Sequence, residues 1–251
     1  MTRHPHHTFI AIAIPVAVVA ALAIGVATAA APTVPSAGIP SPTPTATEIA
    51  PATPITLTRD VDPLSVMFVM DSVGYGRNAS LQQNGFRPLM VDAFTQSGLV
   101  TETSFGSKGF TTAAASSIVQ MPTSLDLAVI ELGTNDERVN TALPQFAFDY
   151  QALLTRITTE APDAAILCIG TLAFYPTAPT YDGIIEQLCS QSGGTYISIA
   201  DITADPQYLA QQGELQFEGP AEDSIHPNDA GHALIAARAL DEITVTTKKA
   251  E

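Results

Sequence analysis

Four side chains in three separate segments of this chain are suited to acyl chemistry. Ser72 follows an apolar run, Asn135 stands in a Gly-Thr-Asn-Asp segment after another, and Asp223 and His226 begin and end an Asp-Ser-Ile-His tetrapeptide. A serine hydroxyl becomes a nucleophile when an imidazole accepts its proton and a carboxylate orients that imidazole. An amide N–H can stabilise the oxyanion that forms. The set therefore predicts attack on an ester by Ser72.

The spacing between Asp223 and His226 favours a tight loop that presents both side chains to one point. Pro227 disfavours helical backbone at His226, so we expect the final helix to begin after it. His232 is an alternative imidazole, but it falls inside that helix and we interpret it as structural. Asp71 is expected to organise the turn around Ser72.

Short apolar runs alternate with helical patterns along the chain. The predicted strands are Ser65 to Met70, Val100 to Ser104, Leu125 to Leu132, Ala164 to Ile169 and Tyr196 to Ala200. The predicted helices are Pro88 to Gly98, Pro144 to Thr159, Tyr181 to Ser190 and Asn228 to Glu242. This alternation predicts an α/β fold, a three-layer α/β/α sandwich with a five-stranded parallel sheet of flavodoxin-like type. Ser72 and Asn135 then lie beyond the carboxyl ends of strands, where such sheets bind ligands.

The region before the domain has two parts. Residues 1–31 carry Arg3, an apolar run from Phe9 to Ile24 and small residues after it, which is typical of a signal peptide; an uncleaved membrane anchor is the open alternative. Residues 32–58 are rich in Pro, Thr and Ala and predict a disordered linker. Residues 59–251 have the size of one domain.

Charge and cysteine usage narrow the partners. The chain carries 25 acidic against 10 basic residues, a formal net charge of −15, so a nucleic acid partner is not expected. Cys168 and Cys189 leave two readings open, a disulfide formed after export or a buried free thiol. No cysteine pair has metal-ligand spacing, and we expect neither a metal nor another cofactor.

These residues resemble the SGNH hydrolases, also called the GDSL family. The resemblance rests on Asp71-Ser72, Gly109, Gly133-Thr134-Asn135-Asp136 and Asp223-Ser224-Ile225-His226, and it covers roughly residues 66–240. It implies Ser72 as nucleophile, His226 as base and Asp223 as its orienting acid. It also implies an oxyanion hole built from the backbone N–H groups of Ser72 and Gly109 and the Asn135 amide. Met70 stands where the family has a glycine, so the turn is expected to be built differently.

We therefore expect an exported serine esterase acting on small acyl esters, either acetylated carbohydrate or a short-chain lipid ester. It is expected to be a monomer, secreted or held in the cell envelope, with a membrane tether if the N-terminal segment is retained. Two alternatives stay open: an O-acyltransferase acting on envelope polysaccharide, and a catalytically inactive glycan-binding domain.

Overall fold

The computed structural model describes residues 54–59, 62–221, 223 and 225–247. A five-stranded parallel sheet forms its centre, in the order β3-β2-β4-β5-β6. The strands are β2 (Leu64–Met70), β3 (Val100–Gly106), β4 (Leu127–Glu131), β5 (Ala165–Ile169) and β6 (Thr195–Ile197). Every residue of β2 and β4 is buried, as expected for strands covered on both faces. The predicted α/β/α sandwich is confirmed.

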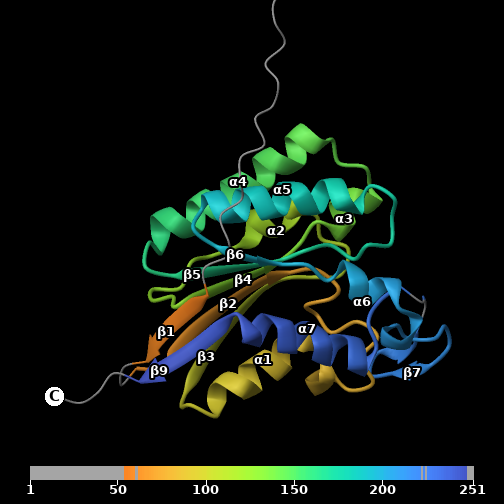
Figure 1. Cartoon of the computed structure of the whole chain (residues 1–251), viewed down its shortest axis with the longest axis horizontal. Helices are drawn as coiled ribbons and strands as arrows, with labels where there is room; N and C mark the ends of the chain where they lie inside the picture. The colour runs from red at the N-terminus through yellow and green to blue at the C-terminus, as the bar shows by residue number, and fades with distance from the viewer. Residues whose placement is uncertain (1–53, 60–61, 222, 224, 248–251) are drawn as a thin grey trace, which may run out of the picture. The chain divides into compact units, whose positions relative to one another are not determined.

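Helices cover both faces of this sheet (Figure 1). Helices α1 (Phe86–Thr95) and α7 (Asp229–Asp241) pack on one face, and α2 (Thr112–Ile118), α4 (Leu143–Glu160) and α5 (Ala178–Gln191) pack on the other. Alternate residues of β2 serve the two sides: Phe68 contributes to the core under α1 and α7, and Met67 to the core under α4 and α5. The four long helices were predicted, with ends that differ by up to three residues.

A second, two-stranded parallel sheet joins the two ends of the described chain. Strand β1 (Ile55–Arg59) pairs with β9 (Ile243–Thr247) in parallel register, and Figure 1 shows the two strands side by side. This corrects the predicted boundary at residues 58 and 59, because folded structure already begins at Ile55. The predicted signal peptide and the linker as far as residue 53 lie outside the described residues.

Several short elements were not predicted. They are α3 (Thr134–Arg138), α6 (Ala200–Ala204), the 3-10 turns Gln82–Asn84 and Pro206–Tyr208, and a small hairpin of β7 (Leu215–Gln216) and β8 (Gly219–Pro220). Helix α2 and strands β1 and β9 were not predicted either. Strand β6 is shorter than predicted, because it lies at the sheet edge and pairs with β5 at only three positions. Within the described part of the chain, no helix combines the length and apolar character needed to cross a bilayer.

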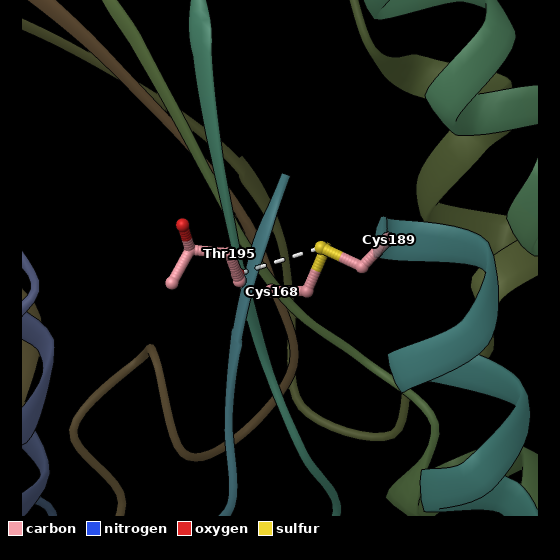
Figure 2. Close-up of a disulfide and its surroundings, with 3 residues drawn as sticks. All are labelled: Cys168, Cys189 and Thr195. Atoms are coloured by element: carbon pink, nitrogen blue, oxygen red, sulfur yellow. Dashed lines mark hydrogen bonds between the residues drawn. A yellow bond between two sulfur atoms is a disulfide. The ribbon is translucent and has the colours of Figure 1, made fainter. Parts of the chain in front are cut away.

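A disulfide joins Cys168 on β5 to Cys189 on α5 (Figure 2). Both residues are fully buried, and the Cys189 sulfur lies 3.4 Å from the carbonyl oxygen of Thr195. The bond links the inner strand β5 to the helix α5 that packs on it. Of the two alternatives that the sequence left open, the structure therefore contains the disulfide and not a buried free thiol.

Candidate active site

The strand register brings the predicted site residues to one edge of the sheet. Met70, the last residue of β2, pairs with Gly106 of β3 on one side and with Glu131 of β4 on the other. The three strands therefore end level with one another. Ser72 follows β2, and Asn135 lies in α3, which begins three residues after β4 ends.

The loop that carries His226 approaches this edge from the C-terminal half of the chain. The His226 carbonyl accepts a hydrogen bond from the backbone N–H of Ala210 at 3.1 Å. After Pro227, the Asn228 side chain caps α7 by accepting the N–H of Gly231 at 3.0 Å. The predicted helix start is confirmed, and the loop is held at both ends.

Ser72, His226 and Asp223 form a continuous chain of hydrogen bonds. The Ser72 Oγ lies 2.9 Å from His226 Nε2, and His226 Nδ1 lies 2.8 Å from Asp223 Oδ1. Ser72 and His226 are 7% and 8% exposed, so the pair is largely shielded yet reachable from solvent. Serine, imidazole and carboxylate thus come together although 154 residues separate the first two.

Electrostatics fix the tautomer of His226. Burial raises the pKa of Asp223, but hydrogen bonds and charge from His226 outweigh it and hold that pKa well below its ordinary value. Asn78 Nδ2 at 3.2 Å and Arg77 Nη2 at 3.4 Å also face the carboxylate. An ionised carboxylate only accepts, so Nδ1 carries the proton and Nε2 accepts from the Ser72 hydroxyl.

The turn around Ser72 is organised by Asp71, as predicted. Asp71 is fully buried, and its Oδ1 accepts the backbone N–H of Val73 at 3.0 Å. Met70 fits here because the neighbouring Gly74 has no side chain: a Cβ on Gly74 would lie 2.4 Å from the Met70 Cβ. The space that the family glycine would leave at position 70 is provided at position 74.

The Asn135 amide is held from both of its ends. Its Nδ2 donates to Asp71 Oδ2 at 2.8 Å, and its Oδ1 accepts from Arg138 Nε at 3.1 Å. Because Asp71 accepts and Arg138 donates, the two contacts fix which end is the nitrogen. An amide nitrogen has two hydrogens, so one remains available beyond the bond to Asp71.

A cleft of about 250 Å³ brings the site residues to one surface. Ser72, His226, Asp223, Gly109 and Asn135 all line it. Gly109 has φ of +78°, a left-handed conformation that glycine adopts without strain. Ser72, Gly109 and Asn135, the residues that carry the three predicted oxyanion donors, therefore line one cleft.

A buried carboxyl beneath the serine turn was missed by the sequence reasoning. Glu131 Oε2 accepts the backbone N–H groups of Gly74 at 3.0 Å and of Asp71 at 3.2 Å. Burial raises the pKa of Glu131 well above its ordinary value, and the charge of nearby Asp71 raises it further. The signal was an acidic residue inside an otherwise apolar strand.

His232 occupies a structural position, as interpreted from the sequence. It is fully buried, its Nε2 lies 3.0 Å from the carbonyl oxygen of Arg77, and its Nδ1 accepts from the N–H of Phe86 at 3.4 Å. Burial lowers the pKa of His232 to about 4, so the ring is neutral at pH 7. Within the described ranges, no three His, Cys, Asp or Glu side chains are grouped so that they could hold a metal ion.

The fold and this cluster define a class of protein, the α/β/α hydrolases with a serine at the end of the first core strand. Residues 71–234 match the GDSL-like Lipase/Acylhydrolase family, and the chain belongs to that family. It is thus a carboxylic ester hydrolase. No curated protein sequence matches the chain.

Solved structures of several esterases share the fold. A two-domain esterase active on acetylated mannans is 18% identical with a TM-score of 0.56, over 72% of this chain and 48% of that one. The chain thus spans about half the length of that esterase. Phospholipase A1 from Streptomyces albidoflavus is 16% identical with a TM-score of 0.56, covering 72% of this chain and 99% of that one. Esterase EstA from a Pseudoalteromonas species is 18% identical, with a TM-score of 0.54 and coverages of 71% and 95%.

Proposed function

We propose that this protein is an exported serine esterase that removes small acyl groups through Ser72, His226 and Asp223. The observation that carries the proposal is the unbroken hydrogen-bond chain from the Ser72 hydroxyl through His226 to Asp223 inside a cleft. A cleft of about 250 Å³ suits an acetyl or another short acyl group better than a long chain.

The reaction follows from the direction of these bonds. His226 Nε2 takes the proton as Ser72 Oγ attacks the ester carbonyl carbon, and the carbonyl oxygen becomes an oxyanion. The backbone N–H groups of Ser72 and Gly109 and the free N–H of Asn135 hold that oxyanion. The bond to the alcohol then breaks, and His226 returns the proton to the leaving oxygen. Water, deprotonated by His226, then attacks the acyl carbon; the bond to Ser72 Oγ breaks, His226 returns the proton to that oxygen, and the acyl group leaves as the carboxylic acid.

Two further points support the substrate and the location. The relatives of known structure include an esterase active on acetylated mannans and a family 3 carbohydrate esterase from Clostridium thermocellum, so an acetylated carbohydrate is the substrate we favour. The Cys168–Cys189 disulfide fits an oxidising compartment and therefore export, with residues 1–31 as signal peptide or anchor. The protein is proposed to act as a monomer.

The proposal is tested with 4-nitrophenyl acetate and a fluorophosphonate. The wild type should turn over the ester and gain one covalent adduct at Ser72, located by peptide mass spectrometry. Ser72→Ala should keep its circular dichroism spectrum and lose both. Retained turnover in Ser72→Ala would remove the nucleophile assignment. No adduct and no turnover in the wild type would instead favour the glycan-binding alternative. An ester appearing on added oligosaccharide would favour acyl transfer.

A further inference from the structure

Cationic side chains gather at the candidate active site of an acidic chain. The described residues include seven Lys or Arg side chains, and three of them, Arg77, Lys108 and Arg138, line the cleft. Asp223 is the single carboxylate among the lining residues. The whole chain has a formal net charge of −15, so an excess of positive side chains around the cleft is the opposite of its overall charge. Positive charge around a cleft concentrates anionic ligands there.

The three cations differ in how their charge is compensated. Arg77 faces Asp223 at 3.4 Å, and Lys108 forms an ion pair with Glu218 at 2.5 Å. Arg138 forms no ion pair with any described carboxylate, and among the described residues its Nε donates a hydrogen bond to Asn135 Oδ1. Unlike the charges of Arg77 and Lys108, the charge of Arg138 is not compensated by a described carboxylate and can bind an anionic ligand.

The position of Arg138 ties that charge to the reacting centre. The hydrogen bond to Asn135 holds the Nε end of the Arg138 guanidinium beside the proposed oxyanion hole. Arg138 Nη2 also lies 3.8 Å from the point where a Cβ on Gly109 would stand, so the group extends over that glycine. A guanidinium has five N–H donors, and one is used by Asn135, so a planar pair remains for an anionic group. Arg138 is exposed, which leaves those donors open to the cleft.

We propose that Arg138 is a specificity residue that binds an anionic group, a carboxylate or phosphate, carried by the ester substrate near the scissile bond. This deepens the proposed function and rests on it. Lys108 and Arg77 strengthen the local field, although their own carboxylate partners weaken their share. The preferred substrates are then esters that bear a negative charge on either the acyl or the alcohol portion, in preference to neutral esters of the same size.

The test compares matched esters on the full chain. For the acyl portion the pair is 4-nitrophenyl hemisuccinate and 4-nitrophenyl butyrate, and for the alcohol portion it is 4-acetoxybenzoate and its methyl ester. Each ratio of kcat/KM, anionic over neutral, is first divided by the same ratio for hydroxide-catalysed hydrolysis. A charge-assisted hydrogen bond predicts a corrected ratio of about 10 or more for one pair, declining as salt is added. The pair that responds identifies the portion that carries the charge.

Variants separate recognition of charge from the support that Arg138 gives to Asn135. Arg138→Gln keeps an N–H donor but removes the charge, so the corrected ratio should fall to about 1. Arg138→Lys should retain part of the preference. Arg156→Gln, which removes a charge on α4 outside the cleft, should leave the ratio unchanged. An equal loss on anionic and neutral esters in Arg138→Gln would overturn the proposal and leave Arg138 as a positioning residue.

Failure of this inference is distinguishable from failure of the proposed function. If Ser72 labels and neutral esters are hydrolysed, but neither anionic ester is preferred, the esterase assignment stands and the role of Arg138 is refuted. If no ester is turned over and Ser72 does not label, the proposed function itself fails, and the anion preference falls with it.

Discussion

A double-mutant cycle should show that Met70 and Gly74 are coupled in their effects on folding stability. A Cβ added at Gly74 would lie 2.4, 2.6 and 2.8 Å from the Cβ, Sδ and Cγ of Met70, and no other atom comes closer. Gly74→Ala should therefore cost about 1–3 kcal/mol of folding stability through overpacking. Met70→Gly removes a side chain that is 5% exposed at the end of β2, which should cost about 3 kcal/mol or more.

In the double variant the clash has no partner. Removal of the Met70 side chain eliminates all three close contacts, so the added methyl group at position 74 should no longer destabilise the fold. The double variant should then be about as stable as Met70→Gly alone, which gives a coupling free energy of about 1–3 kcal/mol. The esterase activity lost in Gly74→Ala should return in part, because Gly74 lies two residues beyond Ser72.

Gly106 provides the matched control. A Cβ on Gly106 would lie 1.8 Å from the Met70 carbonyl oxygen, and its φ is +135°. Both obstacles involve backbone, so Met70→Gly should not rescue Gly106→Ala. Unfolding by urea, followed by circular dichroism because the chain has no tryptophan, gives the four free energies of each cycle. Additive losses in the Met70–Gly74 cycle would refute the account of how this turn replaces the family glycine.

Three further outcomes follow from the described contacts. Asp223→Asn should lower kcat by about 10⁴-fold with little change in fold, since an amide neither fixes the His226 tautomer nor stabilises protonated His226; steady-state kinetics with 4-nitrophenyl acetate checks this. Because burial lowers the pKa of His232 to about 4, unfolding free energy should fall by about 3 kcal/mol between pH 6.5 and pH 4, and His232→Gln should lack this component in urea titrations. Reduction of Cys168–Cys189, which closes a loop of 21 residues, should cost about 3 kcal/mol, measured as a lower Tm; an unchanged Tm would contradict it.

The sequence predicted the main sheet because its signal is local. Strands β2 and β4 are continuous apolar runs of a length that suits buried parallel strands, and α4 and α7 show helical periodicity. Strand β1 was missed although Ile55 to Arg59 alternates buried and exposed residues. Its pairing with β9 depends on a partner almost 190 residues away, and the Pro-rich segment before it favoured a linker.

The residues of the candidate site also fall into those that the sequence could predict and those that it could not. Ser72, His226 and Asp223 could be predicted because few residue types can act as nucleophile, base and orienting acid. Glu131 and Arg138 act through contacts with Asp71 and Asn135 that depend on the register of β2 and β4 and on the turn of α3. An acidic residue in an otherwise apolar strand marks Glu131 as unusual, but no local pattern in the sequence identifies the partners that Glu131 and Arg138 contact.

Met70 departs from the family motif, but the serine turn still has room for its side chain. In this chain the serine turn brings residues 70 and 74 close together, and that approach requires one of the two to lack a side chain. Here the missing side chain belongs to Gly74, and the Ser72–His226 hydrogen bond forms at 2.9 Å beside a buried methionine. The family match itself begins at Asp71, just after Met70. A residue that departs from the motif is therefore weaker evidence against activity than a disrupted site geometry would be. In this chain the distances between serine, imidazole and carboxylate are those of a hydrogen-bonded triad.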